Sequence, residues 1–175
     1  MNIFKIAALV SVIAMISCTS KQVAEIQKPL QVFLVRHGEK VDHSSDAKLS
    51  AAGLERAETL AEMLRNSELE YIHSSDFIRT RDTAKPTASA HGLKMELYNP
   101  DDLPALAEKL RKTGGRHLVV GHSNTTPAMV ELLGGKPGSK INDESEYDRL
   151  YIVTIATDGS VNSLLLRYGN RYHPD

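Results

Sequence analysis

The chain has 175 residues, of which 41% are apolar and 25% are charged, with 21 Lys and Arg residues against 22 Asp and Glu residues. This composition is that of an ordinary globular protein, and it excludes an intrinsically disordered chain and a polytopic membrane protein. A formal net charge of −1 gives no general electrostatic attraction to nucleic acid, and the lack of Trp argues against a base-stacking surface.

Residues 1–17 have the pattern of an export signal. A single basic residue, Lys5, precedes an apolar run that is much shorter than the roughly 20 residues a membrane-spanning helix needs. The run stops just before Cys18, the single cysteine of the chain, in a segment that resembles a bacterial lipobox.

We therefore predict a lipoprotein signal peptide over residues 1–17, cleaved before Cys18, and a polar tether over residues 18–28. Cys18 would carry the lipid, so the protein would be exported and anchored to a bacterial cell-envelope membrane, on the periplasmic face or at the cell surface. The alternatives are an ordinary secretory signal with an incidental cysteine, or an uncleaved anchor.

From Pro29 onward, strand patterns and helix patterns alternate. Short β-branched and apolar runs predict strands, and apolar residues spaced by three or four predict helices. In chain order we predict strand 30–36, helix 50–65, strand 70–73, helix 76–84, strand 93–98, helix 101–112, strand 117–120, helix 125–133, and strands 150–156 and 161–167.

Individual residues set the predicted ends of these elements. Ser50 is a helix N-cap, and an apolar stripe that begins at Leu54 follows it. Pro86 is expected to bend or end the helix that precedes it. The sequence Thr-Asp-Gly-Ser over residues 157–160 predicts a hairpin between the last two strands.

This alternation predicts one α/β domain over residues 29–175. We expect a three-layer α/β/α sandwich with a largely parallel central sheet and an antiparallel C-terminal edge. In sheets of this kind, ligands bind beyond the carboxyl ends of the parallel strands, so the residues at those ends are the candidates for chemistry.

Cationic and imidazole groups follow three of the predicted strands. Arg36 and His37 end the first strand, Arg79 follows the second, and His122 follows the fourth. A lone histidine or arginine in such a place more often has a structural role, but the recurrence favours a shared pocket. Two guanidiniums and two imidazoles predict a site for a dianion such as phosphate, because guanidinium offers the fork geometry that phosphate oxygens accept.

The residues around these positions form four ordered motifs. They are Arg36-His37-Gly38, Leu49-Ser50-x-x-Gly53-x-x-Arg56-Ala57, Ser74-Ser75 continuing through Arg79 to Thr83-Ala84, and Gly121-His122. Together they resemble the histidine phosphatase superfamily (phosphoglycerate-mutase-like), and the resemblance covers about residues 30–168.

The resemblance implies that His37 is the nucleophile and takes the phosphoryl group as a covalent phosphohistidine. It implies that Arg36, Arg79 and His122 bind the phosphate and stabilise the transferring group. No metal or organic cofactor is implied, and no pair of histidines has metal-ligand spacing. Arg81 is an alternative to Arg79, but the register of the surrounding motif favours Arg79.

The chain departs from the family pattern at the general acid. Some members have an aspartate directly after the second histidine, but Ser123 and Asn124 follow His122 here. Glu39 and Glu146 are our candidates, and the identity of the acid stays open; Glu96, Asp101, Asp102 and the rest of the acidic segment 143–146 are further carboxylates. A missing acid would suit a substrate with a good leaving group, such as an anhydride or a phosphoramidate.

The leading hypothesis is a cofactor-independent phosphatase that acts on a small phosphorylated substrate through His37. The alternatives are a non-catalytic phosphate- or phosphoprotein-binding lipoprotein, and a phosphohistidine phosphatase. Mutase activity is not expected, because the residues after Gly38 differ from the loop that follows the Arg-His-Gly motif in phosphoglycerate mutases. We expect membrane contact through the lipid anchor only and no nucleic-acid partner, and the oligomeric state stays open.

Overall fold

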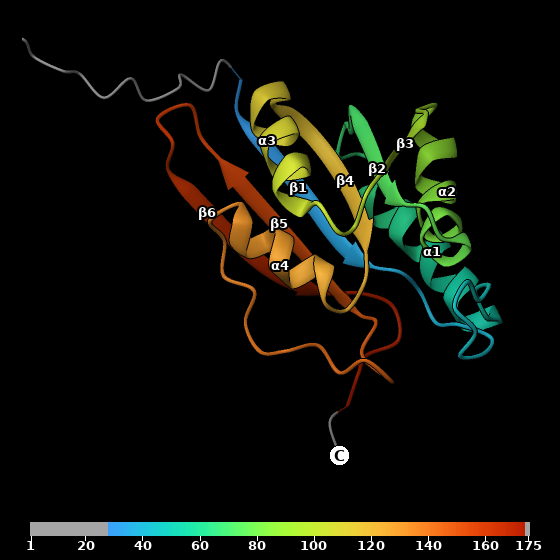
Figure 1. Cartoon of the computed structure of the whole chain (residues 1–175). Helices are drawn as coiled ribbons and strands as arrows, with labels where there is room; N and C mark the ends of the chain where they lie inside the picture. The colour runs from blue at the N-terminus through green and yellow to red at the C-terminus, as the bar shows by residue number, and fades with distance from the viewer. Residues whose placement is uncertain (1–27, 174–175) are drawn as a thin grey trace, which may run out of the picture.

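The computed structural model of the chain describes residues 28–173 (Figure 1). The strands are β1 (Leu30–Arg36), β2 (Tyr71–Ser75), β3 (Met95–Tyr98), β4 (Gly115–Gly121), β5 (Arg149–Ile155) and β6 (Val161–Arg167), and the helices are α1 (Ala51–Leu64), α2 (Ile78–His91), α3 (Leu103–Thr113) and α4 (Thr125–Leu132). The predicted signal peptide, Cys18 and almost all of the tether lie outside the described residues. No helix within residues 28–173 is long and apolar enough to cross a membrane.

All six strands form one sheet in the order β3-β2-β4-β1-β5-β6. The first four of these strands are parallel, because β4 pairs in parallel with β1 and β2, and β2 pairs in parallel with β3. Strands β5 and β6 run antiparallel at the other edge. The predicted fold class, including its antiparallel C-terminal edge, is confirmed.

Strand β1 shows why the molecule has three layers. Leu30, Val32 and Leu34 point to one face of the sheet and belong to the core cluster that α3 and α4 complete. Phe33 and Val35 point to the other face and pack in the cluster that α1 and α2 complete. Since successive strand residues face opposite sides, a strand covered on both faces needs an apolar run, which residues 32–35 supply here. Figure 1 shows the two helix pairs on opposite sides of the sheet.

The prediction allowed Pro86 either to end or to bend its helix; the first alternative was wrong, and a bend stays a prediction. Helix α2 contains Pro86 and runs on to His91, and it ends at Gly92, whose φ of 63° is left-handed. A proline inside a helix removes one hydrogen bond and crowds the preceding turn. Ala84 and Ala88, on either side of Pro86, are buried in the core, so tertiary packing outweighs the local cost.

Helix α1 confirms one predicted end and corrects the predicted stripe. The Ser50 side chain accepts a hydrogen bond from the Gly53 N–H, as an N-cap does. Leu54, however, is 53% exposed. The buried face begins instead at Gly53 and Arg56, because the start of α1 packs against the segment that follows β1 rather than against the sheet.

Candidate active site

The candidate site forms where three adjacent parallel strands end. Strands β2, β4 and β1 are neighbours in the sheet, so their carboxyl ends share one edge, and Arg36, the last residue of β1, lies there with them. The His37 N–H donates to the Gly121 carbonyl at 2.9 Å, which fixes the chain leaving β1 beside the chain leaving β4. His122 follows β4 directly, and Arg79 lies in the first turn of α2, just after β2.

His37 is held in one orientation. Its side chain is 4% exposed, and its Nδ1 lies 2.7 Å from the Gly38 carbonyl oxygen. A carbonyl oxygen can only accept, so Nδ1 carries the proton and the neutral ring leaves a lone pair on Nε2. Burial, with the nearby Arg36 and His122, lowers the pKa of His37 to about 3, although the Gly38 bond opposes the shift. The ring is therefore neutral at ordinary pH.

His122 faces His37, with ring centroids 5.5 Å apart. Its Nε2 lies 2.9 Å from Ser75 Oγ, and Ser75 Oγ donates in turn to Thr80 Oγ1 at 3.1 Å. Because the Ser75 hydroxyl proton goes to Thr80, His122 Nε2–H is the donor to Ser75, and the lone pair of the neutral ring lies on Nδ1. Burial, followed by the positive charges of Arg79 and Arg36, lowers the pKa of His122 to about 4.

The two arginines flank these imidazoles. Arg79 Nη1 donates to the Ser45 carbonyl at 2.9 Å, and Arg79 Nη2 lies 3.5 Å from His122 Nδ1. Arg36 is 2% exposed, lies over the Tyr147 ring at 4.0 Å, and donates through its terminal nitrogens to the loop before β5. Among the described residues, Arg36 Nε and Arg79 Nε are buried donors without a hydrogen-bond partner.

Two further contacts explain the spacing of the motifs. The Gly38 N–H donates to Thr83 Oγ1 at 2.9 Å, and Thr83 Oγ1 donates to the Arg79 carbonyl at 2.7 Å, so Thr83 joins the first and third motifs. A Cβ on Gly38 would lie 2.8 Å from the Gly53 carbonyl oxygen, and a Cβ on Gly53 would lie 2.3 Å from the Glu39 carbonyl oxygen. Both positions need glycine because two backbones touch there.

The four predicted site residues, Arg36, His37, Arg79 and His122, therefore gather at one strand-end edge. The model of the histidine phosphatase superfamily (branch 1) matches residues 32–101 of this chain, which include the first three of them. Residues 32–101 are similar to the histidine phosphatase superfamily.

Curated relatives also match part of the chain. The probable phosphoglycerate mutase GpmB of Yersinia pestis (strain Pestoides F) is 42% identical over 73 residues, which are 38% of this chain and 34% of that protein. The corresponding protein of Yersinia pseudotuberculosis serotype O:1b (strain IP 31758) matches equally. The chain spans about a third of the length of these relatives.

Solved structures show the same fold at low identity. The protein histidine phosphatase SixA, complexed with tungstate, superposes with a TM-score of 0.62 at 20% identity, covering 79% of this chain and 97% of that one. A putative alpha-ribazole-5′-P phosphatase from Escherichia coli K-12 gives a TM-score of 0.62 at 14% identity, covering 81% of this chain and 97% of that one. These structures show that about four fifths of the chain has the same fold.

The first predicted general-acid candidate, Glu39, is held in a structural ion pair. Arg56 Nε lies 3.0 and 3.1 Å from the two Glu39 carboxylate oxygens, and Arg56 Nη2 lies 2.7 Å from Oε1. Arg56 is 5% exposed, so this is a half-buried, charge-assisted pair. Because the pair stabilises the ionised carboxylate, it disfavours the protonated form that a general acid needs.

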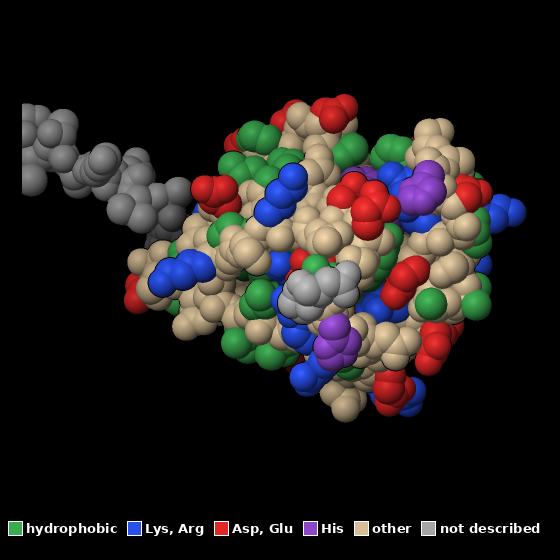
Figure 2. Space-filling model, turned by 90° about the horizontal axis from the view of Figure 1, so that it is seen from below, with side chains coloured by type: hydrophobic (Ala, Val, Ile, Leu, Met, Phe, Trp, Pro, Cys, Tyr) green, Lys and Arg blue, Asp and Glu red, His purple; other side chains and the backbone are tan. Residues whose placement is uncertain are grey.

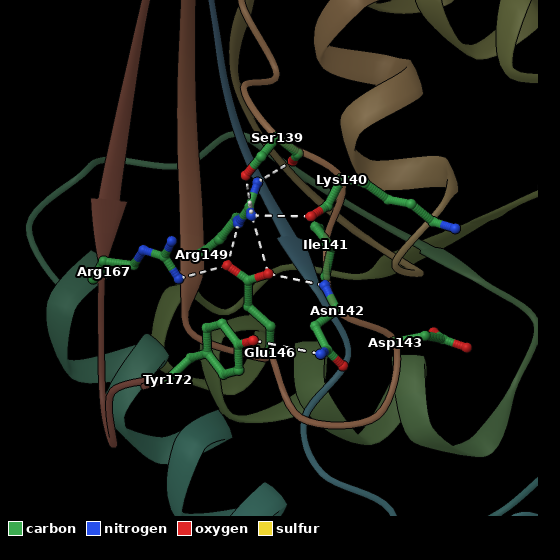
Figure 3. Close-up of a pocket in the computed structure, with 9 residues that line it drawn as sticks. All are labelled: Ser139, Lys140, Ile141, Asn142, Asp143, Glu146, Arg149, Arg167 and Tyr172. Carbon is green, nitrogen blue, oxygen red and sulfur yellow. Dashed lines mark hydrogen bonds and ion pairs between the residues drawn. The ribbon is translucent and has the colours of Figure 1, made fainter. Parts of the chain in front are cut away.

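The second candidate, Glu146, accepts hydrogen bonds from three residues (Figure 3). Arg149 binds both of its oxygens at 2.6 and 3.0 Å, Arg167 binds at 2.7 Å, and the Asn142 N–H donates at 2.9 Å. Burial alone would raise the pKa of Glu146, but these donors outweigh it and lower the pKa. An open pocket of about 670 Å³ lies against this network, and its lining includes neither His37 nor His122.

The other residues considered from the sequence lie in separate contacts. Arg81 forms an ion pair with Asp76 and is not joined to His122, so Arg79 is the arginine at the site. Glu96 pairs with Lys109 at 2.7 Å, and Asp102 caps α3 by accepting from the Ala105 N–H at 3.2 Å. Within residues 28–173, no group of three or more His, Cys, Asp and Glu side chains could hold a metal ion.

The sequence analysis did not single out Asp143 as a residue that contacts the site. Its Oδ1 lies 3.2 Å from Arg36 Nη2 and accepts a hydrogen bond from Ser123 Oγ. The signal was present only as the acidic segment 143–146 before β5, in which the sequence analysis favoured Glu146 over Asp143. Basic and acidic side chains also mix on the face at the carboxyl ends of the parallel strands (Figure 2), so charge sign alone could not reveal the cluster.

The buried histidines predict a loss of stability in acid. Burial and neighbouring groups lower the pKa of His37 to about 3, and those of His73 and His122 to about 4, whereas an unfolded histidine has a pKa near 6.5. The unfolded chain therefore binds protons first as the pH falls below 6.5. The free energy of unfolding should drop between pH 7 and pH 5 by on the order of 1–2 kcal/mol per histidine, as urea titrations at several pH values would measure.

The variant His73→Asn provides the control for this prediction, since His73 is 1% exposed and lies outside the site. Its stability should vary less steeply with pH than that of the wild type. A wild-type stability that is flat from pH 7 to pH 5 would contradict the prediction.

Proposed function

We propose that this chain is a cofactor-independent phosphatase that hydrolyses a phosphomonoester or a related phosphoryl compound through a covalent phosphohistidine on His37. In this proposal Arg36, Arg79 and His122 bind the phosphoryl oxygens; the bound dianion favours the charged form of His122, whose Nδ1–H then donates to it. The match of residues 32–101 to the histidine phosphatase superfamily and the fold shared with phosphatases support phosphatase chemistry in general.

The observation that carries the proposal is the orientation of His37. The bond from Nδ1–H to the Gly38 carbonyl leaves Nε2 unprotonated, and a pKa of about 3 keeps it so across the physiological range. A histidine that only binds an anion would work better as an imidazolium. A neutral imidazole with one free nitrogen among positive charges is suited to nucleophilic attack.

The two unpartnered arginine nitrogens support an anionic ligand. A buried donor without an acceptor costs about 1–3 kcal/mol, and Arg36 Nε and Arg79 Nε are two such donors among the described residues. A phosphoryl group at the site would give both of them an acceptor. Its negative charge would also offset the burial that lowers the pKa of both guanidiniums.

The proposed reaction has two steps. The Nε2 lone pair of His37 attacks phosphorus, the bond from phosphorus to the leaving group breaks, and its electron pair goes to the leaving group. Water then attacks the phosphohistidine, the P–N bond breaks, and its electron pair returns to Nε2 with release of inorganic phosphate. Arg36 and Arg79 stabilise the charge on the equatorial oxygens in both steps.

The second candidate function is a non-catalytic phosphate- or phosphoprotein-binding domain, and the third is a phosphohistidine phosphatase. The likeness to SixA in fold is the observation that favours the third.

We further propose export by residues 1–17 and lipidation at Cys18. A protein in that location would not meet cytoplasmic phosphohistidine substrates, which favours a phosphomonoester as the substrate. Both positions lie outside the described residues.

Trapping of the phosphoenzyme tests the proposal. Purified protein incubated with a radiolabelled aryl phosphate and quenched rapidly should carry label that is stable in base and lost in acid, as a P–N bond is, and peptide mapping should place it on His37. Turnover of para-nitrophenyl phosphate should accompany it. Tight binding of inorganic phosphate with no turnover across a panel of phosphate esters would instead establish the binding domain.

A further inference from the structure

The loop before β5 brings one carboxylate to the edge of the His37 cluster. Arg36 Nη1 donates to the carbonyls of Asn142 and Glu146, both at 3.0 Å, and Arg36 Nη2 reaches Asp143. The guanidinium thereby fixes the loop across the end of β1. Figure 3 shows the Asp143 side chain pointing away from the Glu146 network, on the opposite side from Arg149 and Arg167.

Asp143 differs from the other carboxylates near the site in how many of the four site residues, Arg36, His37, Arg79 and His122, it interacts with electrostatically. Its charge influences the pKa values of Arg36, Arg79 and His122, and protonation of His37 would in turn favour the Asp143 carboxylate. By contrast, Asp46 acts on Arg79, and Glu144 and Glu146 act on Arg36. Among the described carboxylates, Asp143 contacts Arg36 directly and is electrostatically coupled to the other three groups as well.

The exposure of Asp143 fits a role at the mouth of the site. Arg36 and His37 are 2% and 4% exposed, whereas the Asp143 side chain is 71% exposed. A substrate must enter and a leaving group must depart on the open side, where this carboxylate lies. Its two polar side-chain contacts, from Arg36 Nη2 and Ser123 Oγ, both go to Oδ1, so Oδ2 remains the oxygen that can carry a proton.

We propose that Asp143 is a catalytic residue that gives its proton to the leaving group in the first step and takes a proton from water in the second. The inference rests on the phosphatase function proposed above. When the bond from phosphorus to the leaving oxygen breaks, the Asp143 carboxyl proton moves to that oxygen and releases an alcohol. The resulting carboxylate accepts a proton from the attacking water as the P–N bond breaks, which restores the acid.

A bound phosphoryl group favours the protonated form of Asp143, which a proton donor must have. In the free site, the hydrogen bond from Ser123 and the charge of Arg36 favour the carboxylate, against the effect of its partial burial, and the pKa of Asp143 is lowered. A phosphate dianion that Arg36 and Arg79 hold brings like charge close to the carboxylate, and like charge favours protonation. Substrate binding and protonation of Asp143 are therefore coupled.

The consequence is a wider substrate range. A phosphatase without an acid would be confined to good leaving groups such as an anhydride or a phosphoramidate. With Asp143 in this role, the site can also expel alkoxide leaving groups, which depart as alcohols. Alkyl phosphomonoesters are therefore the substrate class for which Asp143 matters most.

The test compares two leaving groups in the full-length protein. Asp143→Asn should slow hydrolysis of an alkyl phosphate by about 100-fold or more, while it changes hydrolysis of para-nitrophenyl phosphate, whose leaving group needs no proton, by less than about fivefold. Asp143→Glu should restore part of the alkyl phosphate activity. Glu144→Gln, which removes the same charge from the neighbouring exposed position, should leave both rates unchanged.

A purely structural role, in which Asp143 only holds the loop against Arg36, predicts a different result. Asp143→Asn would then slow both substrates by the same factor, and that outcome would overturn the inference while the phosphohistidine still formed. No effect on either substrate would overturn it as well. If the wild type forms no phosphoenzyme and turns over neither substrate, the proposed function fails and the role of Asp143 fails with it.

Discussion

His37→Ala is expected to abolish turnover, with kcat for para-nitrophenyl phosphate reduced by about 10⁴-fold or more. The substitution removes the free Nε2 that the Gly38 carbonyl orients, so no phosphohistidine can form. Inorganic phosphate should still bind within about tenfold of the wild-type affinity, because Arg36, Arg79 and His122 are unchanged. Steady-state kinetics and isothermal titration calorimetry measure the two quantities separately.

His43→Ala is the matched control for this experiment, since His43 is an exposed histidine in the segment between β1 and α1. It should retain wild-type kinetics. Activity of His37→Ala within tenfold of the wild type would exclude His37 as the nucleophile. Equal loss of turnover and of phosphate binding would indicate that the substitution had disrupted the site as a whole.

Arg56→Leu is expected to lower the free energy of unfolding by about 3–5 kcal/mol. The Arg56 guanidinium binds the Glu39 carboxylate and also donates to the carbonyls of Tyr168 and Asn170, at 2.7 and 2.9 Å. Its removal leaves the Glu39 charge and two carbonyl groups without their donors. Urea denaturation monitored by circular dichroism would measure the change.

The double variant Glu39→Gln/Arg56→Leu should regain part of that loss, because the unpaired charge is then gone. Arg65→Leu is the control at the end of the same helix, where the arginine is 67% exposed and paired with Glu62; it should change stability by less than about 0.5 kcal/mol. A loss of less than 1 kcal/mol for Arg56→Leu would show that the Glu39–Arg56 pair contributes little to the free energy of unfolding.

The order of the elements could be predicted well from the sequence. Strand β1 occupies the predicted residues Leu30–Arg36, because a strand buried on both faces leaves a continuous apolar run. Helix α1 begins after the predicted N-cap Ser50, because capping depends on neighbouring residues alone. Pro86 was misjudged, since its effect on α2 depends on how firmly the rest of the helix packs against the sheet.

The residues of the candidate site could be predicted, but their protonation states and ion-pair partners could not. Residue type and position at the strand ends pointed to Arg36, His37, Arg79 and His122. The assignment of Glu39 and Glu146 as acid candidates could not foresee that Arg56 and Arg149 would bind them. Arg56 lies in another element and is joined to Glu39 by tertiary contact, which no local pattern records.

The sequence by itself determined which strand ends carry imidazole and guanidinium groups, because strand and helix periodicity and the parallel topology follow from local patterns and chain connectivity. Only the tertiary structure decided which nitrogen of His37 is free and which carboxylate reaches the cluster. Proton position depends on a single carbonyl 2.7 Å away, and the position of Asp143 depends on a loop that Arg36 holds from over 100 residues earlier in the chain. These are matters of distance and burial, which arise only when the chain has folded.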